Sequence, residues 1–203
     1  MTHIANDTGR AYRSELRAQQ AEETRTRILD ATVHVMAGGL AFVSMPAVAQ
    51  EAGVSVPTVY RHFGTKRDLI AAVFPHLARK AGLDDVATPR SVDEFRDWAR
   101  AMFDRMDSLD DMARAAMASP ASDVTRRVTM PQRLAKIRQL ADVLAPNLTQ
   151  VDGDRFARLL VILTSSSAQR MLRDPIGLTA DEIADDLDWV VRAVIAAAPG
   201  NGR

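Results

Sequence analysis

The chain has 203 residues, 47% of them hydrophobic, and its 26 lysine and arginine side chains balance its 26 aspartate and glutamate side chains. This length and apolar fraction suit one or two globular domains and exclude global disorder. The absence of cysteine excludes disulfides, zinc–thiolate sites and thiol catalysis. With a polar N-terminus and no uninterrupted apolar stretch of membrane-spanning length, we expect a cytoplasmic protein.

The charge is unevenly distributed along the chain. Residues 1–80 contain 10 lysine and arginine residues against 7 acidic ones, whereas residues 81–203 contain 16 against 19. The difference favours the N-terminal part as the one that meets a polyanion, and chance unevenness is the alternative explanation.

Helical periodicity runs through almost the whole chain, and no segment alternates polar and apolar residues as a strand does. The first predicted helix covers about residues 22–38 and ends at a pair of glycines. Residues 1–21 form an N-terminal arm, either a disordered tail or an extension of this helix. Whether its arginines follow a DNA groove stays open; they are Arg10, Arg13 and Arg17.

Two short helices with a tight turn between them come next. Ser44 is a suitable N-cap for a helix over about residues 45–52, with Pro46 tolerated in its first turn. Gly53 stands where a left-handed residue would end that helix.

The second short helix is predicted over about residues 56–63, with Ser55 as its N-cap. Val59 and Phe63 are four residues apart and should face inward, against Val48 and Ile28 of the preceding helices.

Capping signals mark the later helices. "TKRD" at 65–68 opens a helix to about residue 80, and "SVDE" at 91–94 opens an apolar helix of about five turns. Pro120 and Pro131 are expected to break the region that follows. A long helix is predicted over 152–173, and "TADE" at 179–182 opens the last one.

A short helix, a glycine-containing turn and a second short helix match the helix-turn-helix arrangement, whose second helix enters the DNA major groove. The alternative is an ordinary helical hairpin with a solvated polar face. The residues left available to DNA carry hydroxyl, imidazole, cationic or small apolar groups. They are Ser55, Val56, Pro57, Thr58, Tyr60, Arg61, His62 and Lys66.

The run "AGVSVPTVYRHFGTKRDL", within the match over residues 24–70, closely resembles the DNA-binding signature of the TetR family of bacterial transcriptional regulators. The resemblance implies an all-α fold with a helix-turn-helix domain over 22–64 and a ligand-binding and dimerisation bundle over 65–203. It also implies the roles of matching residues. Base edges or adjacent backbone would be met by Val56, Pro57, Thr58 and Tyr60, and phosphates by Arg25, Ser44, His62 and Lys66.

One position departs from the family pattern. Some relatives carry a base-reading arginine early in the second helix, where this chain has Pro46, which cannot donate a hydrogen bond. Sequence readout would then depend on the third helix, on Arg61 or on the arm.

The larger domain matches the family by pattern alone. The two closing helices, 152–173 and 180–198, would form the interface of a homodimer, with the internal core as the alternative role. The interface candidates are Leu159, Leu163, Ser167, Leu187, Val191 and Val194.

The remaining helices would enclose a ligand cavity. The ligand is expected to be small and apolar, because no cluster of buried charges is evident. The candidates, each of which could equally be core, are Trp98, Met102, Phe103, Met106, Met117, Met130 and Phe156.

We therefore expect a sequence-specific DNA-binding regulator, a repressor that a small molecule releases from a palindromic operator. No metal, cofactor or catalytic residue is expected, since the histidines form no H-E-x-x-H motif and no glycine-rich phosphate loop is present. The alternative is an architectural or protein-binding helical module without ligand response.

Overall fold

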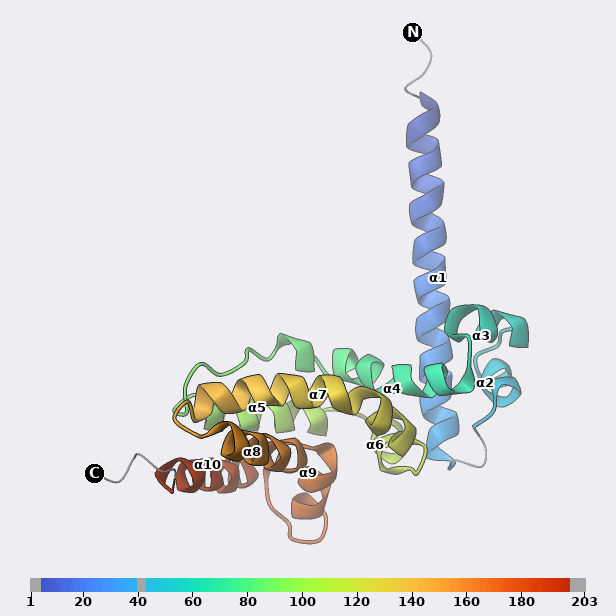
Figure 1. Cartoon of the computed structure of the whole chain (residues 1–203). Helices are drawn as coiled ribbons and strands as arrows, with labels where there is room; N and C mark the ends of the chain where they lie inside the picture. The colour runs from blue at the N-terminus through green and yellow to red at the C-terminus, as the bar shows by residue number, and fades with distance from the viewer. Residues whose placement is uncertain (1–4, 40–42, 198–203) are drawn as a thin grey trace.

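The computed structural model describes the backbone of residues 5–39 and 43–197. Within these ranges the chain forms ten α-helices and one 3-10 turn, and no strand. Residues 1–4 of the predicted arm, and the side chains of Arg10 and Arg13, lie outside the described part. The helix α1 (Ala5–Ala37) stands upright at one side of the molecule and projects well beyond it, while the later helices extend away as a layered bundle (Figure 1). Most of the arm is therefore an extension of the first helix.

The two predicted short helices are present with their predicted caps. Helix α2 (Met45–Glu51) begins after Ser44, whose hydroxyl oxygen accepts a hydrogen bond from the Ala47 amide at 3.2 Å. Helix α3 (Val56–Phe63) begins after Ser55, whose hydroxyl oxygen accepts from the Thr58 amide at 3.3 Å. Both caps are local effects, which is why the sequence predicts them correctly.

A first hydrophobic core holds the short helices against α1. Ile28, Val48 and Val59 are fully buried in it, and Phe63 is 6% exposed. The same core includes α4 (Lys66–Lys80), through Leu69 and other residues, and α6 (Asp111–Ala118). The packing therefore continues across residue 64, the predicted domain boundary.

A second hydrophobic core lies in the bundle that forms the rest of the molecule. Four helices provide most of it, and its fully buried side chains include Phe95 and Leu160. The 3-10 turn η2 (Leu83–Asp85) leads into this bundle. Its helices are α5 (Phe95–Asp107), α7 (Ser122–Leu144), α8 (Gln150–Leu163) and α10 (Ala180–Ala196), with α9 (Ser166–Arg173) between the last two.

Helix α5 begins three residues later than its capping pattern predicts. The Glu94 carboxylate accepts a hydrogen bond from the Arg90 amide at 2.8 Å, so it closes the turn before the helix. The prediction that "SVDE" caps this helix is therefore wrong, whereas Thr179 and Glu182 do form the predicted capping box of α10.

Pro131 lies inside α7 and does not break it. A proline in a helix interior removes one backbone hydrogen bond, so tertiary contacts on both sides must hold the helix together. On one side the Thr125 hydroxyl donates to the Ile70 carbonyl at 2.7 Å, and on the other Ile137 and Leu140 are buried in the second core.

The predicted helix over 152–173 is two helices. Thr164 ends α8, with its hydroxyl donating to the Leu160 carbonyl at 2.7 Å, and the Ser165 hydroxyl oxygen accepts from the Ala168 amide at 3.1 Å to begin α9. The run of serines is thus an N-cap and not a close-packing stripe in one continuous helix.

In the part of the chain described here, no helix is long and apolar enough to cross a membrane.

Candidate nucleic-acid interface and ligand cavity

The turn between α2 and α3 sets one short helix across the other. Gly53 has φ +63°, a left-handed conformation that glycine adopts without steric cost. The Val54 amide donates back to the Ala49 carbonyl at 3.0 Å, which closes the end of α2. Within two residues Ser55 begins α3, so the direction of the chain changes over a very short distance.

The outer face of α3 is polar and accessible. Tyr60 is 51% exposed, and Ser55, Pro57 and Arg61 are exposed as well. Thr58 is partly buried, and its hydroxyl lies 2.9 Å from that of Ser55. Val56 also packs partly against the first core, so only part of its side chain can contact a ligand.

Positive charge gathers at this face, and its nearest acidic neighbour in sequence is Asp68 in the first turn of α4. Residues 55–67 contain three side chains that are positive at neutral pH and no carboxylate. Arg61 is on α3, while Lys66 and Arg67 are the exposed first residues of α4. A helix N-terminus favours anions, so Lys66 and Arg67 add to a favourable field. Arg67 was missed by sequence reasoning, although its position next to Lys66 was a usable signal.

Arg25 of α1 contacts the C-terminal end of α3 through its guanidinium group. Its Nη1 donates to the His62 carbonyl at 3.2 Å, and its guanidinium carbon lies 4.4 Å from the centroid of the Phe63 ring. The contact combines a hydrogen bond with a cation–π interaction at the C-terminus of α3. Arg25 thus positions the short helix, a role the sequence did not suggest.

His62 is mainly neutral at pH 7. Partial burial lowers the pKa of His62 below its ordinary value of 6.5, and the charges of Arg61 and Arg25 lower it further, against an opposing effect of Glu22. Ser44, predicted to approach phosphate, is partly buried, and the oxygen of its hydroxyl is used in capping α2. Its hydroxyl proton can still be donated to an anion.

A cavity of about 180 Å³ lies in the layer next to the first core. Its walls come from α1, α4, α6, α7, α8 and α9, and include Met36 of α1 and Leu77 of α4. Two arginines of α7, Arg126 and Arg133, also line it. The expectation of a cavity without charged groups is therefore wrong, because helical spacing alone did not reveal which face of α7 turns inward.

The predicted pocket residues separate into two groups. Met117 and Met130 line the cavity. The other five lie elsewhere. Phe103, Met106 and Phe156 are buried in the second core, and Trp98 packs against that core as a partly buried side chain. Met102 is partly buried on the same helix as Trp98. Aromatic and methionine side chains at helical spacing thus form core here more often than cavity wall.

The predicted dimer residues also differ in accessibility. Leu159 is 51% exposed on α8, whereas Leu187 and Val191 are buried in the core of the chain itself and offer no surface to a partner. Leu163 and Val194 are partly buried, and the Ser167 hydroxyl accepts a hydrogen bond from Arg126 at 3.2 Å. Large apolar side chains that the sequence reasoning missed are exposed instead, notably Ile162 at 62% and Trp189 at 72%.

No group of three or more His, Asp or Glu side chains in the described ranges is arranged to hold a metal ion. The arrangement around α3 is instead that of a helix-turn-helix DNA-binding head carried by a larger helical domain.

Comparison with known proteins agrees with this class. Residues 28–73 match the family model described as "Bacterial regulatory proteins, tetR family". The HTH-type transcriptional repressor KstR of Mycobacterium tuberculosis is 42% identical over 79 residues, which are 38% of this chain and 34% of that protein. The HTH-type transcriptional regulator SrpR of Pseudomonas putida is 38% identical over 68 residues, 33% of this chain and 32% of that protein. The alignments thus span about a third of these relatives.

Solved structures share the fold over most of the chain. A TetR-like transcriptional regulator from Rhodococcus sp. RHA1 superposes with a TM-score of 0.58 at 18% identity, covering 86% of this chain and 96% of that one. The multidrug binding protein EbrR, complexed with imidazole, gives a TM-score of 0.59 at 19% identity, covering 87% and 97%.

The match to the TetR family of bacterial transcriptional regulators thus covers the DNA-binding head of the chain, residues 28–73. The curated relatives that it matches carry the names of transcriptional regulators.

Proposed function

We propose that this protein is a transcriptional repressor that binds a palindromic operator as a homodimer in the cytoplasm and leaves the operator when a small molecule enters the cavity. The repressor names of the KstR relatives support the direction of regulation. The observation that carries the proposal is the position of the cavity, because helices that support α3 also form its wall.

In this proposal α3 enters the major groove. Val56, Pro57, Thr58 and Tyr60 lie toward base edges, and Arg61 adds a bidentate donor for sequence readout. Phosphates are contacted by residues at the edges of this face, with Arg67 added to the sequence-based set. These are Ser44, His62, Lys66 and Arg67.

A single head covers one half-site, so two heads at a fixed spacing are needed for a palindrome. We assign the dimer surface to the exposed apolar side chains of α8 and α10, namely Leu159, Ile162 and Trp189. The two α3 helices must then lie about 34–36 Å apart, one turn of the DNA helix, or a multiple of that distance.

Release follows if a ligand binds better to the conformer whose heads are wrongly spaced. Met36 of α1 and Val73, Phe74 and Leu77 of α4 line the cavity, so a ligand that moves these side chains moves the helices that hold α3. EbrR, named as a multidrug binding protein, is a precedent for small-molecule binding in this fold.

The test is selection of bound fragments from the source genome with purified full-length protein at physiological salt. Recovery of one palindromic sequence with half-sites a helical turn or a multiple apart is the expected result. Recovery of unrelated fragments, with a steep salt dependence and no sequence preference, would support the architectural alternative and overturn the proposal.

A further inference from the structure

The charges in the cavity wall lie on one face of α7. Arg126, Met130 and Arg133 are spaced by four and three residues, so their side chains project from the same side of the helix into the cavity. An apolar ligand does not require two guanidinium groups at this position. The partners of each arginine therefore show which charge is already compensated.

Arg126 is compensated within the chain. Its Nη1 donates to the Asp123 carboxylate at 2.5 Å, and its Nη2 donates to the Met117 carbonyl at 3.1 Å and to the Ser167 hydroxyl at 3.2 Å. These contacts tie α7 to α6 and α9. Arg126 is thus a fixed part of the wall with an acidic partner of its own.

Arg133 has no such partner. Its Nη2 donates to the carbonyls of Val161 at 3.2 Å and Thr164 at 3.0 Å, at the C-terminus of α8. Among the described residues it forms no ion pair, and its Nε and Nη1 donate no hydrogen bond to any of them. Burial lowers the pKa of the Arg133 guanidinium, and the nearby charge of Arg126 lowers it further.

A partly buried cation beside a second cation is costly unless an anion accompanies it. The carbonyls at the end of α8 offset only part of this cost, because they are partial charges that engage one nitrogen. The Nε and Nη1 groups of Arg133 remain available, so the oxygens of an anion in the cavity can accept charge-assisted hydrogen bonds from them.

The remainder of the wall limits the size and character of the anion. Met36, Leu77 and Met130 provide apolar surface, so a hydrated inorganic ion would leave most of the wall without contacts. The volume of about 180 Å³ is close to that of cavities that hold a single small hydrocarbon. The ligand must therefore combine one anionic group with a short apolar body.

We propose that the effector is a small amphipathic monocarboxylate, whose carboxylate pairs with Arg133 and whose hydrocarbon part packs against Met36, Leu77 and Met130. This inference rests on the proposed function, because it names the ligand class of the same cavity. It replaces the neutral apolar ligand that the sequence suggested.

The first experiment is calorimetric titration of the purified full-length protein with straight-chain carboxylates from acetate to octanoate and with the matching primary alcohols. A carboxylate of intermediate length should bind about 10- to 100-fold more tightly than its alcohol, because a hydrogen-bonded charge pair adds this factor. Acetate should bind weakly, since it lacks the apolar body. No preference for the carboxylate at any chain length would overturn the proposal.

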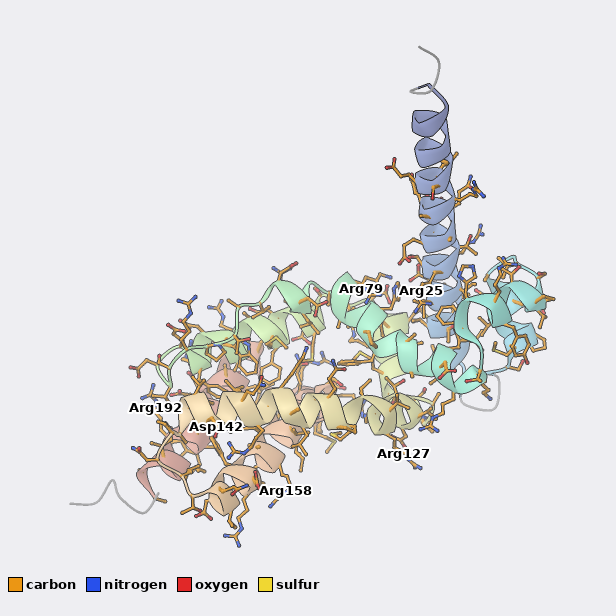
Figure 2. All side chains as sticks on the ribbon, turned by 45° about the horizontal axis from the view of Figure 1, so that its top comes forward. Arg25, Arg79, Arg127, Asp142, Arg158 and Arg192 are labelled. Carbon is orange, nitrogen blue, oxygen red and sulfur yellow. The ribbon has the colours of Figure 1, made fainter. Side chains whose placement is uncertain are left out.

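The second experiment uses charge-removing variants of the same helix. Arg133→Met should abolish the carboxylate preference, and Arg133→Lys should retain part of it because the charge remains. Arg127→Met is the matched control, since Arg127 is the exposed neighbour of Arg126 and projects from the outer edge of the molecule (Figure 2). If Arg133→Met is helical by circular dichroism and still prefers carboxylates, the assignment to Arg133 fails.

DNA binding separates this inference from the proposed function. Each ligand is added to a complex of protein and labelled operator, and release is followed by fluorescence anisotropy. Carboxylate binding without release would leave the cavity assignment standing and contradict ligand-controlled repression. Release by the alcohols and not by the carboxylates would contradict the inference and leave ligand-controlled repression standing.

Discussion

The crossing of α2 and α3 depends on a single backbone conformation, that of Gly53. A β-carbon added at Gly53 would meet no atom within 4 Å, so the cost of a substitution comes from the left-handed φ of +63° and not from a clash. We expect Gly53→Ala to lower the free energy of unfolding by about 1 kcal/mol. Gly53→Asn should cost less, because asparagine tolerates this conformation better. Urea denaturation measures both, and equal losses would contradict a conformational origin.

Lys66 and Tyr60 should affect DNA binding in different ways. Removing the charge in Lys66→Ala should weaken binding to operator and random DNA alike and reduce the salt slope by about one unit, if one phosphate contact is lost. Tyr60→Ala should weaken operator binding more than random binding, because its exposed side chain faces the bases in the proposed complex. Anisotropy titrations over a range of salt concentrations test both. An equal loss on the two DNAs for Tyr60→Ala would remove Tyr60 from sequence readout.

His62 should make operator binding depend on pH. Because the folded chain lowers the pKa of His62, the stability this group contributes is present above the unfolded pKa of 6.5 and decreases as pH falls through it. A DNA phosphate has the opposite effect, since it favours the protonated ring. We expect operator affinity to rise from about pH 8 to about pH 6, and His62→Gln to remove most of this rise. An identical pH dependence in the variant would show that another group is responsible.

At the scale of the elements, the hold of α1 on α3 depends on Arg25. Arg25→Met removes both the hydrogen bond to the His62 carbonyl and the cation–π contact with Phe63. We expect the free energy of unfolding to fall by about 1–2 kcal/mol. Arg27→Met is the control, since Arg27 is exposed on the same helix. Thermal denaturation of both variants measures the loss of stability. If Arg25→Met loses no more stability than the control, the positioning role of Arg25 is contradicted.

Elements whose limits depend on neighbouring residues could be predicted from the sequence. The caps at Ser44, Ser55 and Thr65 are of this kind, because an N-cap hydroxyl bonds an amide three residues ahead. Pro131 was misjudged because α7 is held by distant contacts, including that of Thr125 with Ile70. Tertiary packing outweighed the local preference of proline in that helix.

In the candidate site, too, features set by local sequence could be predicted and features set by tertiary packing could not. The inward side chains of α3 and the exposure of Tyr60 follow from spacing within one short helix. The cavity arginines could not be predicted, because the environment of Arg133 depends on how six helices pack together. Within the described ranges that packing gives Arg133 no ion-pair partner. The same limit explains why Leu187 and Val191 were proposed for a dimer surface although they face the core of the chain.

At the scale of the whole molecule, the exposed indole of Trp189 should control assembly. Placing a charge in the proposed apolar interface by Trp189→Arg should convert the dimer to a monomer at micromolar concentration and weaken operator binding, since one head then binds alone. Sedimentation equilibrium gives the mass directly. Met112→Arg, which charges an apolar side chain 42% exposed on α6, should leave the dimer intact. Dimers of unchanged stability in Trp189→Arg would place the interface elsewhere.

Helix α1 is one uninterrupted element. Its Met36 lines the cavity, and its Arg25 contacts α3. The two residues are eleven positions apart, which is roughly 16 Å along a helix. If the helix tilts as a rigid rod by about 5° around Met36, Arg25 moves by about 1.4 Å, comparable with half the length of a hydrogen bond. A ligand thus has no need to reorganise the head internally, because a small tilt of α1 already displaces the groups that must meet fixed atoms on DNA.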